Sequence, residues 1–294
     1  ATPHALFIDL GASASDVWVV NDGYWGIAVT EGQRYNFQFY LFTEELKNTV
    51  VTAALLDCEE QIVVSKNFQI ERDGSWNHYE GAFTVDTTAN DLRFALLLPH
   101  KGKVYIDFVS MFPENTFCGH KNGLREDVAG MLRDLRPDFV RWPGGCIVEG
   151  LTMDNRIKWK ETIGDIVKRP GEYNLWGYRS TYGFGYHEFL QFCEDIDADG
   201  LFVCNAGMSC LFRNGDYWEE ENRIDNLIQD ALDAVEYALG DTTTVYGKRR
   251  AENGHAAPFP LKYVEVGNEN VGLRYVKNYN RFYKAIKEKY PQIE

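Results

Sequence analysis

The sequence predicts a two-part chain, in which an antiparallel β-sandwich is followed by part of an α/β barrel of the (β/α)8 type. Three observations predict this fold. Residues 1–112 alternate apolar and polar side chains with period two and contain no convincing helix. After Pro113, amphipathic helices alternate with short apolar strands, which is the pattern of a parallel sheet. The strands of this second part all run into polar turns that contain glycine, and a barrel carries its functional residues at such strand ends.

The predicted sandwich comprises residues 1–112. Its clearest strands lie at residues 35–41, 92–98 and 104–108, where every second side chain is apolar. Turn signals separate the strands, such as Asn21-Asp22-Gly23 and Lys101-Gly102-Lys103. Short alternating strands of this kind are typical of an antiparallel sandwich.

The predicted barrel segment comprises residues 113–294. Its first helix carries apolar residues at helical spacing between Leu124 and Leu135, and Pro137 ends it. A strand over 138–142 and a long polar and aromatic loop to about residue 186 follow. The remaining elements are a helix over 187–197, a strand over 201–204, a helix over 224–238, a strand over 261–266 and a last helix with Tyr279, Phe282, Ile286 and Tyr290. Three strands are fewer than the eight of a barrel, so we expect a fragment of a longer enzyme.

Composition and charge exclude several classes of protein. Apolar residues make up 45% of the chain and charged residues 25%, as in soluble globular proteins. The formal net charge is −14, which would repel nucleic acid and anionic membranes, whereas a neutral polysaccharide is indifferent to it. No apolar run approaches the ~20 residues of a membrane span. The aromatic content of 14% fits either a sugar-binding protein or a large aromatic core.

The six cysteines do not predict a metal site or a disulfide framework. None of them stands at CxxC spacing, and the chain is too large to need disulfides for its stability. We therefore expect most of them to be small buried apolar residues, and we expect no metal and no cofactor.

The strand that ends in Gly267-Asn268-Glu269 carries the clearest chemistry. A glycosidase needs a carboxyl group held rigidly beside the glycosidic oxygen, where it donates a proton. An amide just before it can bond the neighbouring sugar hydroxyl, so Asn268 and Glu269 supply both groups. The alternative is a turn asparagine and a surface glutamate. By strand alternation Glu265 faces the barrel interior, and we interpret it as a structural ion-pair partner.

A series of motifs runs through residues 113–294. They are NGLR at 122–125, FVRWPGGCIVEG at 139–150, WKETIG at 159–164, RPG at 169–171, EFLQF at 188–192 and EVGNE at 265–269. This series resembles glycoside hydrolase family 51, in the branch shared by plant and some bacterial arabinofuranosidases. In that branch a carbohydrate-binding-like β-sandwich precedes the barrel segment, and residues 24–40 resemble it.

The resemblance implies roles for five residues. Glu269 would be the catalytic acid/base, and Asn268 would hydrogen-bond the 2-hydroxyl of arabinose. Cys146 stands where many bacterial relatives carry a sugar-binding asparagine; because a thiol is a weaker hydrogen-bonding group, it is either a sugar contact or a structural loop residue. Trp176 lies in the long loop, where relatives place an aromatic residue over the aglycone side, or it packs a lid. Asn205 lines the pocket or is a turn residue.

Other residues have supporting roles in this interpretation. Arg141 and Trp142 are expected to pair and pack beneath the site. The family's nucleophile is a glutamate on a later strand, which we expect beyond residue 294, since Glu149 lies well past its strand end and is a poor substitute. In the sandwich, Trp18, Trp25 and Trp76 form a glycan platform or serve only in packing.

The sequence thus predicts a retaining, exo-acting α-L-arabinofuranosidase that releases terminal arabinofuranose from arabinoxylan, arabinan or arabino-oligosaccharides of plant cell walls. Two alternatives stay open: an endo-β-glucanase or xylanase of the same family, and a non-catalytic carbohydrate-binding protein. A homo-oligomer is also open. We expect a secreted or periplasmic protein, although no signal peptide is visible in a chain that begins at Ala1.

Overall fold

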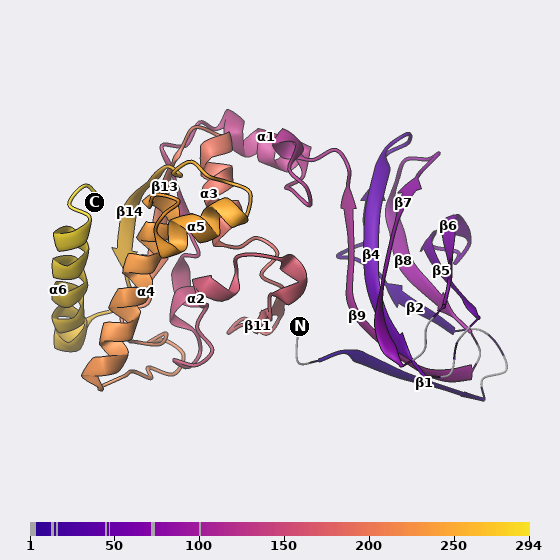
Figure 1. Ribbon diagram of the computed structural model, residues 1–294, viewed down its shortest axis with the longest axis horizontal. Coiled ribbons are helices and arrows are strands. Elements are labelled where there is room, and N and C mark those ends of the chain that lie inside the picture. The colour runs from indigo at the N-terminus through magenta and orange to yellow at the C-terminus, as the bar shows by residue number, and fades with distance from the viewer. Residues whose placement is uncertain are drawn as a thin grey trace. The chain divides into compact units, whose positions relative to one another are not determined.

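The protein consists of two compact units that meet in the sequence between Met131 and Leu132 (Figure 1). A computed structural model describes residues 4–12, 15, 17–44, 46, 48–71, 74–99 and 101–294. The last strand of the first unit ends at Pro113, next to the boundary expected from the sequence. The compact unit continues past this strand to Met131.

The first unit is built from two antiparallel sheets. One has the strand order β1-β9-β4-β7, and the other has the order β2-β8-β5-β6 with β3 paired to β8. Alternation along the strands explains the packing, because Phe37, Phe39 and Leu41 of β4 are buried while the residues between them face outward. The strands are β1 Leu6–Ala12, β2 Val17–Asn21, β3 Ile27–Val29, β4 Arg34–Thr43, β5 Val50–Leu56, β6 Ile62–Gln69, β7 Ser75–Thr84, β8 Ala89–Leu98 and β9 Lys101–Pro113.

The second unit is built around a parallel sheet with the order β10-β13-β14. Helix α3 packs against β10 and β13, and α4 packs against α5, α6 and β14 (Figure 1). The core contains Phe189 of α3, Phe202 of β13, Val235 of α4 and Phe282 of α6. The main elements are α1 Glu126–Asp134, β10 Phe139–Trp142, α2 Gly145–Glu149, β11 Glu172–Tyr173, β12 Arg179–Ser180, α3 Tyr186–Asp195, β13 Asp199–Cys204, α4 Glu221–Leu239, α5 Val245–Glu252, β14 Leu261–Val266 and α6 Gly272–Lys289; short 3-10 turns lie at 117–119, 159–161 and 166–168.

Two helices differ from the sequence expectation. Helix α1 forms where predicted, but Met131 is 72% exposed and Leu135 75%, so its apolar stripe lies at the surface. Helix α5 was not predicted. It is anchored by the buried guanidinium of Arg250, which donates hydrogen bonds to five backbone carbonyls, those of Tyr237, Ala238, Gly240, His255 and Ala256. Such polar anchoring leaves no apolar periodicity to detect.

Two further expectations concern the burial of the cysteines and the lack of a membrane-spanning segment. Cys193, Cys204 and Cys210 are buried, but Cys58 and Cys118 are exposed, so burial of most thiols was only partly right. Among the residues that the structure describes, no helix combines the length and the hydropathy that a membrane span requires.

Candidate active site

The candidate site lies where the three parallel strands end. Their carboxyl ends share one edge of the sheet, so the turns that follow β10, β13 and β14 meet there. Hydrogen bonds join the turn after β10 to the turn after β14, although more than a hundred residues separate them. The structure thereby brings together three residues predicted from the sequence, Cys146, Asn268 and Glu269.

Glu269 lies at the surface of this edge in an uncommon backbone conformation. Its φ is +49°, in the left-handed region that a residue with a side chain seldom adopts. Just before it, Gly267 has φ +78°, and a Cβ there would lie 2.4 Å from Oδ1 of Asn270. The turn therefore needs glycine at position 267 and holds Glu269 outward from the strand end. Strained backbone that its surroundings enforce is often found at functional sites.

The thiol of Cys146 lies against Glu269, with Sγ 3.8 Å from Oε2. Burial, followed by the neighbouring Cys210 and the charges of Glu149 and Glu269, raises the pKa of Cys146 to about 12. The thiol is therefore neutral near pH 7, and it donates to the carboxylate of Glu269. A neutral thiol is not a nucleophile.

Asn268 is held between a cation and an anion. Its Oδ1 accepts a hydrogen bond from Nη2 of Arg141 at 2.9 Å, and its Nδ2 donates to Oε2 of Glu149 at 3.2 Å. These partners fix the orientation of the amide, because arginine only donates and a carboxylate only accepts. Asn268 is 8% exposed, so its position is set by the surrounding structure.

Glu149 belongs to the site, although sequence reasoning placed it too far beyond its strand. The short helix α2 turns the chain back, so that Glu149 lies under the turn after β14 and is 1% exposed. Its Oε1 accepts a second amide hydrogen bond, from Nδ2 of Asn270 at 2.8 Å. Burial raises the pKa of Glu149, as does the charge of Glu269, whereas the hydrogen bonds with Asn268, Asn270 and the thiol of Cys210 lower it.

The pairing expected beneath the site is confirmed. Arg141 donates to Glu265 through both Nε and Nη2, at 2.7 Å and 2.6 Å. This bidentate pair links β10 to β14 across the intervening strand. Trp142, 8% exposed, packs among the rings of Tyr186, Phe189 and Phe202.

Asn205 and Trp176 lie in different settings. The side-chain amide of Asn205 is buried and hydrogen-bonds only backbone groups. It donates to the carbonyls of Val148 at 2.9 Å and Met208 at 3.1 Å, and it accepts from the N–H of Gly207. This is the geometry of a turn residue, and its sugar contact stays a prediction. Trp176 lies in the loop between β11 and β12 and is 48% exposed, and its contact with the aglycone side stays a prediction.

The three tryptophans of the first unit do not form one platform. Trp18 belongs to β2 and packs over Ala54 and Ala95, whereas Trp76 belongs to β7 in the other sheet, and Trp25 lies in the turn before β3. Of the two roles that the sequence left open, a single platform is therefore excluded, because β2 and β7 belong to different sheets.

A carboxylate at the end of a parallel strand, next to a fixed amide, supplies one of the two carboxyl groups that a glycoside hydrolase uses. Residues 131–294 match the family described as alpha-L-arabinofuranosidase 1 domain, and the chain belongs to this family.

Similar proteins agree with this assignment. Alpha-L-arabinofuranosidase 1 of Arabidopsis thaliana is 37% identical over 287 residues, which cover 97% of this chain and 41% of that protein. The extracellular exo-alpha-L-arabinofuranosidase of Streptomyces chartreusis is 36% identical over 300 residues, or 98% and 35% of the two chains. The structure of an arabinose-bound α-L-arabinofuranosidase of glycoside hydrolase family 51 matches with a TM-score of 0.89 and 29% identity, over 99% of this chain and 48% of that one. The chain thus spans less than half the length of these relatives.

Proposed function

We propose that the protein is a retaining, exo-acting α-L-arabinofuranosidase in which Glu269 is the catalytic acid/base. One observation carries this proposal. Glu269 projects from the end of β14 with an enforced positive φ, beside an amide whose orientation is fixed by Arg141 and Glu149. A proton donor held rigidly next to a hydroxyl-binding amide is what cleavage of a glycosidic bond requires.

We also propose that residues 113–294 are an arc of a (β/α)8 barrel. The strand order β10-β13-β14 follows the sequence order. With right-handed crossovers, strands added in sequence order place all their helices on one face of the sheet, as in a closed barrel. Arg141 and Glu265 then occupy the inner face, and the site lies at the catalytic end.

In this mechanism the residues of the chain have distinct tasks. Glu269 protonates the leaving oxygen and later activates water. Asn268 has a second N–H besides the one bonded to Glu149, and this group would hold the 2-hydroxyl of arabinose. Arg141 and Glu149 position Asn268. The nucleophile must be a second carboxylate about 5–5.5 Å from Glu269. We place it on a later strand, because Glu149 already accepts hydrogen bonds from two amides and Glu265 is already paired with Arg141.

The proposed substrate is a terminal arabinofuranose on arabinoxylan, arabinan or a related oligosaccharide. The names of the relatives support this choice, and they give no support to an endo-β-glucanase or xylanase. The extracellular Streptomyces relative supports a secreted location.

A second candidate function belongs to the first unit, residues 1–112, which we propose as a carbohydrate-binding-like sandwich. Across the outward face of its four-stranded sheet, Phe7, Tyr105, Phe42 and Trp76 form one row of neighbouring rings, with centroids 4.8–5.9 Å apart. A groove of about 630 Å³ on the same sheet is lined by polar side chains, among them Asn36, Gln38, His78 and Glu80. Exposed rings beside hydrogen-bonding groups suit a neutral glycan, which supports a binding role for this face of the sheet.

The test of the catalytic proposal uses the natural full-length gene product with Glu269→Ala. Hydrolysis of arabinan should fall by several orders of magnitude, whereas the first step with an activated aryl arabinofuranoside should survive, because a good leaving group needs little protonation. Added azide should restore turnover by replacing the base-activated water. Glu219→Ala, at an exposed residue of the same unit, is the control. Arabinan hydrolysis by Glu269→Ala at near the parental rate would show the assignment to be wrong.

A further inference from the structure

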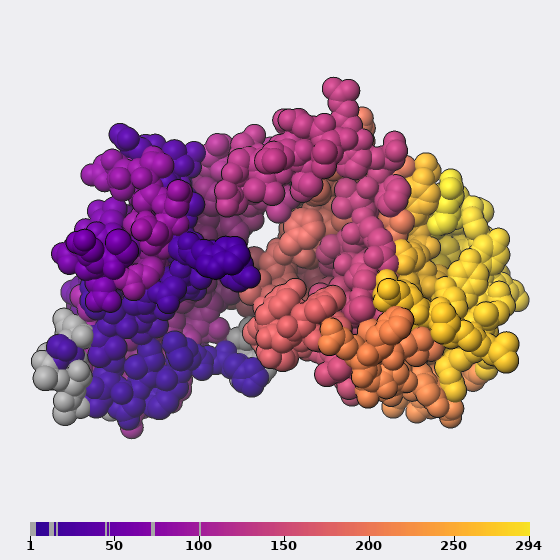
Figure 2. Space-filling model, turned by 180° about the vertical axis from the view of Figure 1, so that it is seen from behind, coloured from indigo at the N-terminus to yellow at the C-terminus, as the bar shows by residue number. Residues whose placement is uncertain are grey.

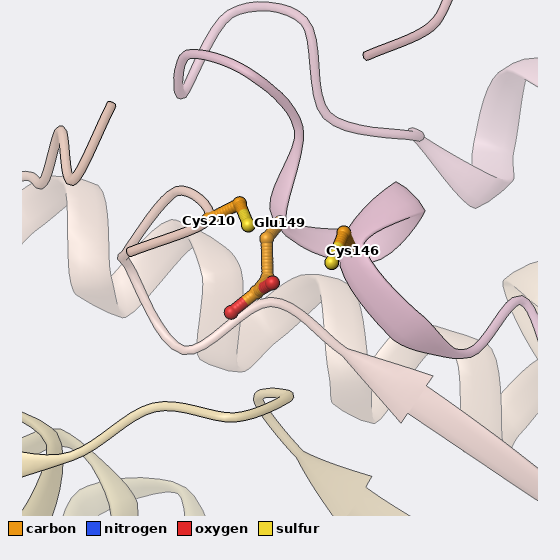
Figure 3. Close-up of side chains that lie close together, drawn as sticks. All are labelled: Cys146, Glu149 and Cys210. Carbon is orange, nitrogen blue, oxygen red and sulfur yellow. The ribbon is translucent and has the colours of Figure 1, made fainter. Parts of the chain in front are cut away.

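Two thiols and a carboxylate converge in the second unit (Figure 3), and one of the thiols, that of Cys146, hydrogen-bonds Glu269. The sulfur atoms of Cys146 and Cys210 and a carboxylate oxygen of Glu149 all lie within 4.8 Å of one another. Cys146 and Glu149 come from α2, and Cys210 comes from the loop after β13. Figure 3 shows the three side chains pointing toward one another. Sequence spacing gave no sign of this cluster, because Cys210 is far from Cys146 along the chain.

The backbone holds the two cysteines in place through a single residue. The N–H of Gly150 donates to the carbonyl of Cys146 at 2.8 Å, and the carbonyl of Gly150 accepts from the N–H of Cys210 at 3.1 Å. Gly150 has φ +76°, and a Cβ there would lie 2.6 Å from the nitrogen of Arg156. The cluster is therefore a rigid feature of the fold, set by a position that only glycine fits.

The carboxylate of Glu149 is oriented but lacks a cation. One of its oxygens accepts an amide hydrogen bond from Asn268 and the other from Asn270, and the thiol of Cys210 also hydrogen-bonds this carboxylate. A cation bound by Cys210 would take the place of that thiol proton. No ion pair joins Glu149 to any residue in the described part of the chain. Metal-binding side chains are commonly oriented by such outer hydrogen bonds, and buried charges are normally paired or bound to a metal.

We propose that Cys146, Glu149 and Cys210 form a binding site for a thiophilic cation such as Zn²⁺, and that its occupation inhibits the enzyme. Two sulfur ligands and one carboxylate suit Zn²⁺ or Cu⁺ and do not suit Mg²⁺ or Ca²⁺. On binding, the two thiols release their protons to solvent and the thiolates bond the cation. Glu269, with Oε2 3.8 Å from Sγ of Cys146, stands at the open fourth position.

The inhibition follows from this position. Glu269 lies close enough to Cys146 to bind the same cation as its fourth ligand, and a carboxylate bound to a cation cannot hand a proton to a leaving group. This consequence rests on the proposed function, whereas cation binding itself does not. The two parts therefore need separate measurements.

The experiment titrates the reduced, chelator-treated, full-length gene product with Co²⁺, whose thiolate complexes absorb in the near ultraviolet. We expect one Co²⁺ per chain with sulfur-to-metal charge-transfer absorption, displacement by Zn²⁺, and loss of arabinofuranosidase activity over the same range. Cys210→Ala should weaken Co²⁺ binding by more than about 100-fold, since loss of an outer hydrogen bond alone costs 10–100-fold. Cys193→Ala, at another buried thiol of the same unit, is the matched control and should bind as the parent does.

The outcomes separate the site from its effect. Absence of charge-transfer absorption in the parental protein overturns the proposal without any variant, and so does equal affinity in Cys210→Ala. If Cys210→Ala does not fold, Asn270→Ala serves instead, with a 10–100-fold weakening expected. Co²⁺ binding with unchanged hydrolysis rejects the inhibitory part. A protein that binds Co²⁺ but hydrolyses no arabinofuranoside refutes the proposed function and leaves the metal site standing.

Discussion

Asn268 is the side chain on which the polar contacts of the candidate site converge. Its side chain joins Arg141 to Glu149, and its backbone N–H donates a hydrogen bond to Oδ1 of Asn270 at 3.3 Å. A side chain held this firmly needs no reorganisation when charge develops on the sugar, and preorganised groups of this kind contribute mainly to the transition state.

We therefore expect Asn268→Ala to lower kcat more than it raises KM. Loss of one preorganised donor typically reduces kcat by about 10²–10³. The measurement is steady-state kinetics of the full-length protein on an aryl arabinofuranoside. A change confined to KM would mean that the amide contributes to ground-state binding only, and it would refute a transition-state role.

Asn205 offers a contrasting prediction at the same scale. Its amide bonds the loops after β10 and β13, so Asn205→Ala leaves buried backbone groups without partners. We expect a loss of about 1–3 kcal/mol in the free energy of unfolding, measured by urea denaturation. An unchanged stability with a raised KM would instead support the sugar contact predicted from the sequence.

At the scale of elements, the helices α4 and α6 are joined by charges at one end. Glu221, in the first turn of α4, pairs with Lys277 and Arg281 of α6, and Asp225 pairs with Arg281. The Lys277 hydrogen bond, followed by the charges of Arg281 and Lys277, lowers the pKa of Glu221 below its ordinary value of 4.5. A lowered carboxyl pKa in the folded state stabilises the protein above the unfolded pKa.

Glu221→Gln should accordingly reduce the Tm at pH 7 by no more than a few degrees, since exposed pairs contribute little. The sign follows from linkage: the contribution is complete above about pH 4.5 and is lost as the pH falls through the folded pKa. Thermal melts of parent and variant from pH 7 to pH 3 should therefore converge at low pH. A difference in Tm that is constant with pH would refute this charge effect, and Glu252→Gln on α5 is an exposed control.

Some strands and helices could be predicted from the sequence, and others could not. Strands β4 and β14 were predicted within a few residues, because their burial follows a simple periodicity or an apolar run. Helix α2 was missed, since its five residues are too few to show a period. The role of Glu149 depends on that turn, and the approach of Cys210 depends on contacts distant in sequence. Local sequence patterns predict neither the turn made by α2 nor the approach of Cys210 to Cys146.

At the scale of the molecule, the second unit presents apolar side chains at its surface. Leu273 of α6 is 90% exposed and Val276 is 51% exposed; Figure 2 shows α6, in yellow, on the outside of its unit. The parallel sheet ends at β10 on one edge and β14 on the other. Parallel sheets are normally covered on both faces and protected at their edges. These surfaces favour self-association when residues 1–294 are expressed by themselves.

The carboxylates of the site lead to a prediction for that polypeptide. A retaining glycosidase needs a nucleophile about 5–5.5 Å from its acid/base. Among the described residues near Glu269, Glu149 is buried and bonded to two amides, and Glu265 is paired with Arg141 through both oxygens. Neither carboxylate is available to attack the anomeric carbon.

We therefore expect residues 1–294, expressed as an isolated polypeptide, not to hydrolyse 4-nitrophenyl α-L-arabinofuranoside, although Glu269 is present. Near-ultraviolet circular dichroism and sedimentation first establish that the polypeptide is folded and in what state of association. Its release of 4-nitrophenol is then compared with that of its own Glu269→Gln variant, and the two rates should be equal. Turnover by a folded monomer that disappears in Glu269→Gln would mean that a second catalytic carboxylate lies within these residues, and Glu149 would then be the first to test, because its charge already interacts with that of Glu269.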